Sequence, residues 1–225
     1  VIVDAADELN TQAANALLKA LEEPPANATL LLVAHQPSRL LPTIRSRGRD
    51  LRLDPLWPEA FARALTQAGV DGDAATLAEL SGGSVGQAVE LAQGGGAEIY
   101  ADLVALFATL PRMDRPRVLR LAESMAGKGN ETRFALFLRL FDLFMARAAR
   151  AGVMGPVSEA VAGEATLFAH IAPHQYAART LAELAPTLSA RARHGRAVNL
   201  DPAALVLDMV LKTEEGLRPV LGQTA

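Results

Sequence analysis

The first residue that could take part in chemistry is Asp4, which directly follows the three apolar, β-branched residues 1–3. A run of this kind is typical of a parallel strand buried on both faces. An aspartate at the carboxyl end of such a strand can reach the magnesium ion of a bound nucleotide through water. The alternative is an aspartate that only ends the strand or caps a helix, and the strand alone favours this alternative.

A second group of residues that could take part in chemistry is a cluster of arginines, namely Arg45, Arg47, Arg49 and Arg52. A guanidinium group is planar and permanently charged, so it can bridge phosphate oxygens on which negative charge develops during reaction. A solvated surface cluster without any partner is the alternative, and residue types alone favour it.

The elements around these residues follow an α/β pattern over residues 1–53. Asn10 or Thr11 can cap a helix whose apolar positions share one face and which the double proline at residues 24–25 stops. These apolar positions are Ala14, Leu17, Leu18 and Leu21. Residues 29–34 form a second buried strand, residues 37–45 can form a short helix, and residues 51–53 alternate like a third strand.

From residue 58 onward the pattern becomes helical. Three short helices are expected over residues 58–68, 73–80 and 84–93, followed by longer ones over 97–110, 116–126, 130–151 and 201–215. The helix over 130–151 carries a broad apolar stripe suited to a bundle core. The stripe consists of Phe134, Phe137, Leu138, Phe141, Met145 and Ala148. We expect Pro186 to kink or end the helix that begins near Pro173.

Composition excludes several classes of protein. The chain has no cysteine and its four histidines show no ligand spacing, so we expect no metal site. No apolar stretch approaches the roughly 20 residues needed to cross a bilayer, so we expect no membrane contact and a cytoplasmic location. The formal net charge of -3 disfavours an autonomous nucleic-acid-binding module, which would need salt-sensitive DNA binding by the isolated chain.

Two segments carry a resemblance to a known family. Residues 13–25, AANALLKALEEPP, are very similar to the segment after the Walker B strand in bacterial clamp-loader subunits of the AAA+ class. Helix periodicity explains the alanines and leucines there, but not Asn15, Lys19, Glu22 and Glu23. Residues 35–48, HQPSRLLPTIRSRG, resemble the sensor 1 corner and the SRC motif of that family, with glycine in place of the cysteine.

The resemblance assigns expected functions to individual residues. Asp4 corresponds to the Walker B aspartate, in a degenerate motif. Arg47 corresponds to the arginine finger, which acts in trans on the γ-phosphate held by a neighbouring subunit. His35 stands at the sensor 1 position, where active relatives have a small polar side chain. Residues 81–93, SGGSVGQAVELAQ, resemble the sensor 2 helix, and Gly86 occupies the place of its arginine.

Three departures from active relatives imply a subunit that does not hydrolyse ATP. The glutamate that polarises the attacking water is replaced by Ala5, the usual sensor 1 residue by His35, and the sensor 2 arginine by Gly86. Asp7 and Glu8 lie near the next helix start, where helix-dipole stabilisation is the expected effect. This combination resembles the delta-prime branch of the family. An ATP-hydrolysing gamma/tau-type subunit, or another replication or repair AAA+ ATPase, is the alternative.

The resemblance also implies an architecture and a set of partners. Residues 1–57 are expected to be the C-terminal part of an AAA+ α/β domain that lacks its N-terminal P-loop region. Residues 58–96 would form a three-helix lid, and residues 97–225 an all-α collar that holds the subunits in a ring. The implied partners are the gamma/tau and delta subunits and, through the complex, the sliding clamp and primer-template DNA. No cofactor is expected in this chain, because ATP and magnesium would be bound by partner subunits.

Overall fold

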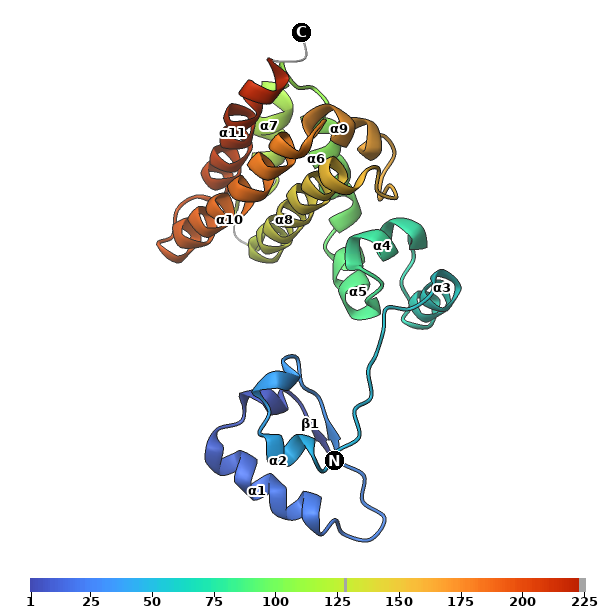
Figure 1. Cartoon of the computed structure of the whole chain (residues 1–225). Coiled ribbons are helices and arrows are strands. Elements are labelled where there is room, and N and C mark those ends of the chain that lie inside the picture. The colour runs from blue at the N-terminus through green and yellow to red at the C-terminus, as the bar shows by residue number, and fades with distance from the viewer. Residues whose placement is uncertain (128, 223–225) are drawn as a thin grey trace. The chain divides into compact units, whose positions relative to one another are not determined.

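The computed structural model describes residues 1–127 and 129–222 and divides into two compact units, Val1–Asp54 and Pro55–Ala225. Each unit is described by itself. Short elements make up the N-terminal unit (Figure 1). In chain order they are β1 (Ile2–Val3), η1 (Ala6–Glu8), α1 (Thr11–Glu22), β2 (Leu31–Leu32), η2 (Pro37–Arg39) and α2 (Pro42–Arg45).

The strands β1 and β2 pair in parallel, with Ile2 opposite Leu31 and Val3 opposite Leu32. The predicted parallel pair is therefore confirmed. The expectation that both faces are covered is wrong for this unit, because Ile2 is 70% exposed and Leu31 is 53% exposed. Their neighbours Val3 and Leu32 are half-buried, since successive side chains of a strand point to opposite faces.

The predicted third strand is absent from the described residues, and Leu51 and Leu53 are more than 80% exposed. Alternation of apolar and polar residues cannot form a strand without a neighbouring backbone to bond with. The helix α1 forms as predicted. The Oδ1 atom of its N-cap residue Asn10 accepts a hydrogen bond from the Ala13 N–H at 2.9 Å, and the helix ends just before Pro24.

The second unit is helical throughout its described part, with no strand beyond residue 100 there. Its first helices are α3 (Pro58–Gln67), α4 (Ala74–Ser81), α5 (Val85–Gln93) and α6 (Gly96–Phe107). They are followed by α7 (Arg115–Glu123), α8 (Glu131–Met154), α9 (Glu164–Ile171), α10 (Gln175–Ala197) and α11 (Pro202–Leu221). All eight helices predicted for this unit are present, and their ends agree within about three residues, except that α11 continues to Leu221 instead of residue 215. The short α9 was not anticipated.

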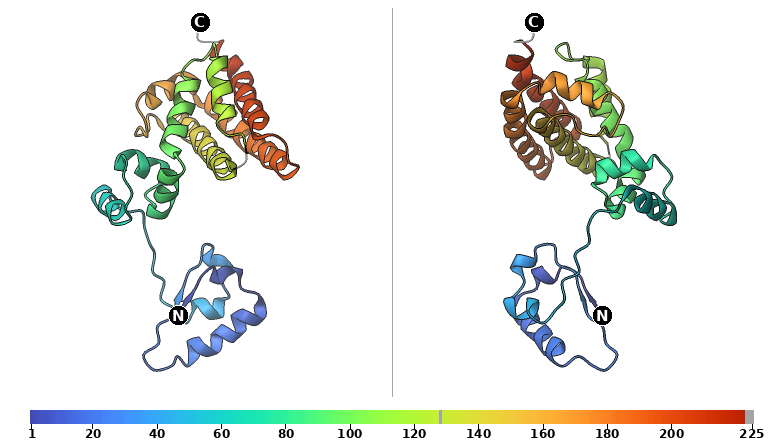
Figure 2. Two further views of the ribbon diagram at one scale, coloured as in Figure 1. Left: turned by 180° about the vertical axis from the view of Figure 1, so that it is seen from behind. Right: turned by 45° about the vertical axis from the view of Figure 1, so that its right-hand side comes forward.

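Pro186 does not end its helix, because α10 continues eleven residues beyond it to Ala197. Proline inside a helix removes one hydrogen bond and costs about 3 kcal/mol. Packing offsets this cost, since α10 lies alongside both α8 and α11 (Figures 1 and 2).

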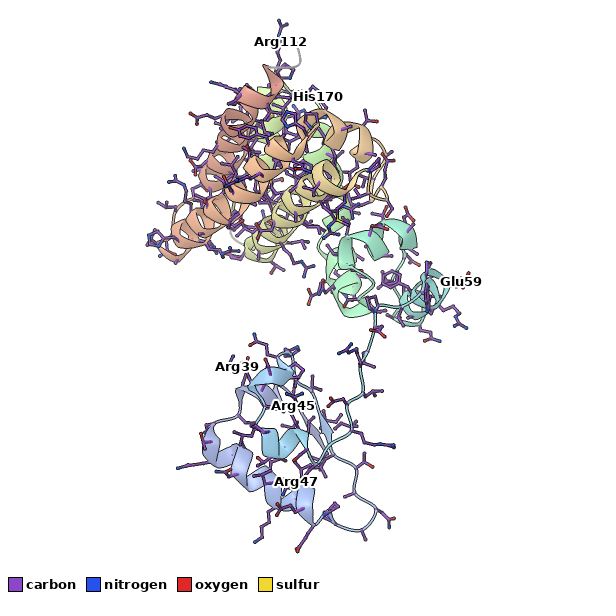
Figure 3. The ribbon with its side chains drawn as sticks, viewed as in Figure 1. Arg39, Arg45, Arg47, Glu59, Arg112 and His170 are labelled. Carbon is purple, nitrogen blue, oxygen red and sulfur yellow. The ribbon has the colours of Figure 1, made fainter. Side chains whose placement is uncertain are left out.

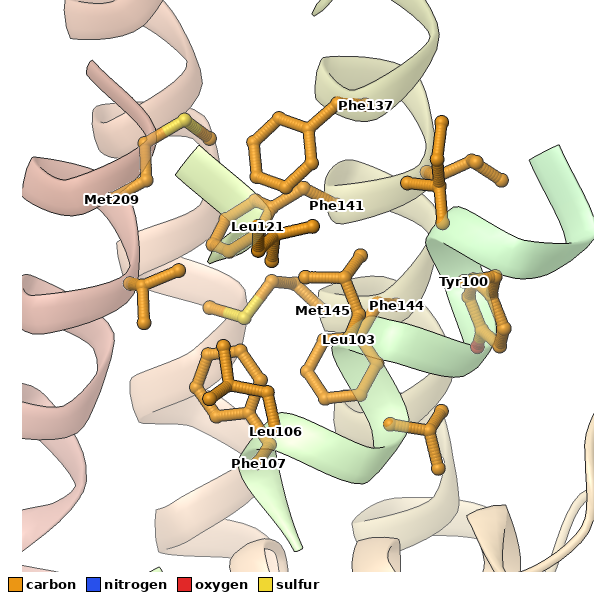
Figure 4. Close-up of a cluster of buried hydrophobic side chains, with 14 of the residues drawn as sticks. Tyr100, Leu103, Leu106, Phe107, Leu121, Phe137, Phe141, Phe144, Met145 and Met209 are labelled. Atoms are coloured by element: carbon orange, nitrogen blue, oxygen red, sulfur yellow. The ribbon is translucent and has the colours of Figure 1, made fainter. Parts of the chain in front are cut away.

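The core of the helical unit is built around α8. All six residues of its predicted apolar stripe are buried, as expected for a bundle core. Side chains from α6, α7 and α11 converge on this stripe (Figure 4). The Phe144 ring stacks on Phe107 of α6 at a centroid distance of 5.0 Å and meets Phe168 of α9 edge-on at 5.5 Å.

A charged network is buried beside this core. Arg147 of α8 is 6% exposed and Glu164 of α9 is fully buried. The Arg147 Nε atom lies 2.8 Å from Glu164 Oε1, and its Nη1 atom lies 3.1 Å from Glu79 Oε2 of α4. The hydroxyl of Tyr100 on α6 also donates to Glu164 Oε1. One arginine thus connects three helices directly and a fourth through its carboxylate partner.

The protonation states suit this network. Burial raises the pKa of the Tyr100 hydroxyl, and the hydrogen bond to the Glu164 carboxylate raises it further. Burial by itself would lower the pKa of the Arg147 guanidinium, but the hydrogen bonds to Glu164 and Glu79 and the electrostatic attraction of Glu164 and Tyr100 together outweigh this effect and raise the pKa. Tyr100 therefore stays a neutral donor and Arg147 stays charged at neutral pH.

We expect Arg147→Met to lower the free energy of unfolding by about 3–5 kcal/mol, because it leaves the Glu164 carboxylate buried without its countercharge. Arg150→Met is the matched control. Arg150 lies one turn further along α8 but is exposed, so this change should stay within about 0.5 kcal/mol. Urea denaturation followed by far-UV circular dichroism measures both. Equal losses of unfolding free energy in the two variants would show that the buried network does not contribute more to stability than an exposed arginine does.

Candidate functional site

The carboxyl ends of β1 and β2 lie at the same edge of the parallel pair, because the two strands run in the same direction. Asp4 directly follows β1 and is exposed, and His35 follows β2 by three residues and is also exposed. The fold therefore brings these two predicted positions to one edge, where open α/β sheets bind their ligands.

The corner after β1 has an unusual backbone. Ala5 has φ 53° and ψ 51°, a left-handed conformation that residues with a Cβ seldom adopt. The turn directs the next N–H group, that of Ala6, to the Val33 carbonyl at 2.8 Å. This bond ties the segment after β1 to the segment after β2. Ala5, at the position where the resemblance predicts a glutamate in active relatives, thus lies within the turn that joins the two strand ends.

Asp7 lies in the first turn of η1, as expected, and makes further contacts that the sequence did not predict. Its carboxylate accepts hydrogen bonds from the backbone N–H groups of His35 at 3.2 Å and Gln36 at 2.9 Å. Desolvation tends to raise the pKa of Asp7, but the hydrogen bonds from the Gln36, Asp7 and His35 backbones lower it below its usual value. The helix-dipole interpretation is therefore incomplete, because Asp7 anchors the corner that carries His35. Its sequence position gave no signal of this contact across 28 residues.

Arg47 lies just beyond the short helix α2 and is held from two directions (Figure 3). Its Nη1 atom donates to the Thr43 carbonyl at 2.9 Å, and its Nη2 atom pairs with Glu22 Oε1 at 2.8 Å. Glu22 is the last residue of α1. The Arg47 side chain nevertheless remains 36% exposed. Sequence reasoning singled out Glu22 in the motif but did not identify it as the partner of Arg47.

The other arginines of this segment differ from Arg47. Arg39, Arg45, Arg49 and Arg52 are exposed, and none forms an ion pair with another of the described residues. Figure 3 labels two of them, Arg39 and Arg45, together with Arg47. Of this cluster, only Arg47 has a guanidinium fixed by both a carboxylate and a carbonyl.

Gly86 belongs to the helical unit and lies in the first turn of α5, after the N-cap residue Ser84. The Ser84 hydroxyl accepts a hydrogen bond from the Gln87 N–H at 3.4 Å. A Cβ atom added at Gly86 would meet nothing within 4 Å, so a side chain would fit there. The helical packing of this unit therefore does not require glycine at this position.

Among residues 1–127 and 129–222, no group of three or more histidine, cysteine, aspartate or glutamate residues is arranged to hold a metal ion. Over the same residues, no helix has both the length and the apolar character needed to cross a membrane.

Comparison with known proteins identifies the class. Residues 1–57 match the family described as DNA polymerase III, delta subunit. The chain is 47% identical over 87 residues to the DNA polymerase III subunit delta' of Pseudomonas aeruginosa, covering 37% of this chain and 26% of that protein. It is 38% identical over 110 residues to the delta' subunit of Bacillus subtilis, covering 48% of this chain and 33% of that protein.

A more limited similarity links the chain to a second kind of subunit. It is 40% identical over 73 residues to the gamma/tau subunit of Mycobacterium bovis, covering 31% of this chain and 13% of that protein. Together the matches support a DNA polymerase III subunit of the clamp-loader type. Within that class, the similarity to the delta-prime subunits of Pseudomonas aeruginosa and Bacillus subtilis extends over 37% and 48% of the chain, compared with 31% for the gamma/tau subunit. The matches therefore support a subunit of the delta-prime kind.

The matched regions span about a quarter to a third of the length of these delta-prime relatives. Asp4, His35 and Arg47 fall inside residues 1–57, whereas Gly86 lies beyond them. The functions expected for these four residues stay predictions, as do the lid and collar boundaries.

We expect Asp7→Ala to loosen the corner at His35 and Gln36, because both N–H groups lose their acceptor. Their amide hydrogen exchange, measured by NMR, should become faster, while exchange in the helical unit stays unchanged. Asp4→Ala is the control, since Asp4 is an exposed aspartate at the same strand edge with no hydrogen bond to another described residue. Exchange accelerated equally by both variants would contradict the anchoring function of Asp7.

Proposed function

We propose that this chain is part of a delta-prime subunit that does not hydrolyse ATP. The subunit joins gamma/tau and delta subunits in the clamp-loader ring and supplies Arg47 to the ATP held by a neighbouring subunit. In this way it contributes to loading of the sliding clamp onto primer-template DNA. ATP and magnesium are bound by the partner subunits.

The observation that carries this proposal is the fixed but accessible guanidinium of Arg47. A guanidinium has five N–H donors. The Thr43 carbonyl and Glu22 each occupy one donor at short range, so further donors and about a third of the side-chain surface stay available. A planar cation held in this way can stabilise the charge that develops on transferred phosphate oxygens.

The absence of hydrolysis rests on different residues. Ala5 cannot act as the base that positions water, and Gly86 cannot neutralise phosphate charge. A working gamma/tau-type ATPase is the second candidate, and the similarity to the Mycobacterium bovis subunit favours it. The two candidates differ in whether the subunit itself releases phosphate from ATP.

We expect the purified full-length subunit to release phosphate far more slowly than about 1 per second, a rate within the usual range for enzymes. A general base contributes about 10² to 10⁴ in rate, and Ala5 supplies none. Steady-state phosphate release, repeated after removal of any contaminating subunit, measures this. A sustained rate near about 1 per second would favour the gamma/tau-type function.

We expect Arg47→Ala to slow DNA-stimulated ATP hydrolysis and clamp loading by the complex reconstituted with gamma/tau and delta subunits. Arginine fingers contribute about 10³ to 10⁵ in rate at a single site, but other sites in the ring would keep their own fingers, so the total loss should be smaller. The variant should fold and assemble, because an exposed ion pair contributes only about 0.2–1 kcal/mol.

Arg45→Ala and Arg49→Ala are matched controls, since both remove an exposed arginine of the same segment that has no ion-pair partner. Each should reduce ATP hydrolysis much less than Arg47→Ala does. Equal effects of all three would indicate a general contribution of positive charge, and failure of Arg47→Ala to assemble would indicate a structural function.

A further inference from the structure

The ion pair between Glu22 and Arg47 joins two elements that are distant in sequence. Glu22 ends α1 and Arg47 follows α2, and their Oε1 and Nη2 atoms lie 2.8 Å apart. The Glu22 side chain is 51% exposed and the Arg47 side chain is 36% exposed, so the pair lies at the surface. Such a pair adds little to folding stability. Its main effect is therefore on the orientation of the Arg47 guanidinium.

The position of Glu22 on its helix is unfavourable for a carboxylate. The C-terminal end of a helix carries partial negative charge, so an acidic residue there is repelled and a cation is attracted. Arg47 places its guanidinium beside this end and compensates for the repulsion. Helix stability alone therefore does not explain a glutamate at this position.

The contacts of Arg47 restrict its rotation while leaving donors available. Glu22 binds one Nη group and the Thr43 carbonyl binds the other. With both Nη groups held, the plane of the guanidinium is set by the ends of α1 and α2. The Nη1 atom also donates a long hydrogen bond to the Ser46 hydroxyl at 3.5 Å. The Nε–H group and the second N–H of Nη2 remain for an incoming anion.

We propose that Glu22 is a positioning residue that orients Arg47 before a neighbouring subunit presents its nucleotide. This inference rests on the function proposed for Arg47. Without Glu22, the long arginine side chain would sample many rotamers and would have to be ordered during each reaction. In this proposal Glu22 does not contact the nucleotide itself and acts only through Arg47.

The test compares Glu22→Gln with Glu23→Gln in the reconstituted clamp-loader complex. Both variants remove one negative charge from adjacent exposed glutamates, but only Glu22 pairs with an arginine in the described structure. We expect Glu22→Gln to lower DNA-stimulated ATP hydrolysis about two- to five-fold, the range that an exposed ion pair can supply, and Glu23→Gln to leave it unchanged.

A double-mutant cycle separates positioning from a general structural effect. If Glu22 acts through Arg47, Glu22→Gln should cause no further loss in a subunit that already carries Arg47→Ala. A further loss of the same size, unchanged hydrolysis in the single variant, or faster hydrolysis would each overturn the inference. Faster hydrolysis would mean that Glu22 competes with the phosphate for Arg47.

Side-chain ¹⁵N relaxation of Arg47 gives a readout that does not depend on ATP hydrolysis. Glu22→Gln should lower the order of the guanidinium in the isolated subunit, and Glu23→Gln should not. Unchanged order would refute the positioning function directly. A different outcome is that Arg47→Ala leaves hydrolysis unchanged while Glu22→Gln still lowers the order of the guanidinium. In that case Arg47 is not a finger and Glu22 cannot position one. Only the existence of the ion pair in solution would then be supported.

Discussion

The pair formed by Arg147 and Glu164 is the interaction on which the arrangement of the helical unit depends. Both groups are buried, and each would be strongly disfavoured there without the other. Their contacts join α8 and α9 and extend to Glu79 of α4 and Tyr100 of α6. The pair adds little net stability compared with apolar packing, but it penalises any packing that separates these helices. It therefore favours one arrangement among those that the apolar stripes permit.

The N-terminal unit is organised by the opposite kind of contact. It has three buried apolar residues, Ala6, Ala14 and Ile44, and its charged pair lies at the surface. Hydrogen bonds from backbone N–H groups join the segments at its strand edge, from Ala6 to the Val33 carbonyl and from His35 and Gln36 to the Asp7 carboxylate. Small changes of charge can alter geometry there without disturbing a large core. This property suits a segment proposed to present a side chain to another subunit.

The surface location of the charged pair in the N-terminal unit connects the proposed finger function of Arg47 with the proposed positioning by Glu22. A finger must be fixed well enough to meet a phosphate and remain free enough to reach it. The Thr43 carbonyl and the Glu22 carboxylate provide the first property, and the surface location provides the second. In the proposed function, Ala5 and Gly86 bear on hydrolysis at the subunit's own nucleotide site, whereas Arg47 acts on the nucleotide of a neighbouring subunit. A subunit that does not hydrolyse ATP can therefore still supply the arginine finger.

Local periodicity and capping in the sequence predicted the helices of the helical unit other than α9, the parallel strand pair and the apolar stripe of α8. Motif spacing singled out Asp4, His35 and Arg47. The sequence did not reveal that α10 continues through Pro186, that residues 51–53 form no strand, or that α9 exists. Tertiary structure alone decided the partners of Asp7, Glu22 and Arg147, which lie 28, 25 and 17 residues away. Such contacts depend on how chain segments meet in space, and residue types in one segment do not specify which distant group will compensate a charge.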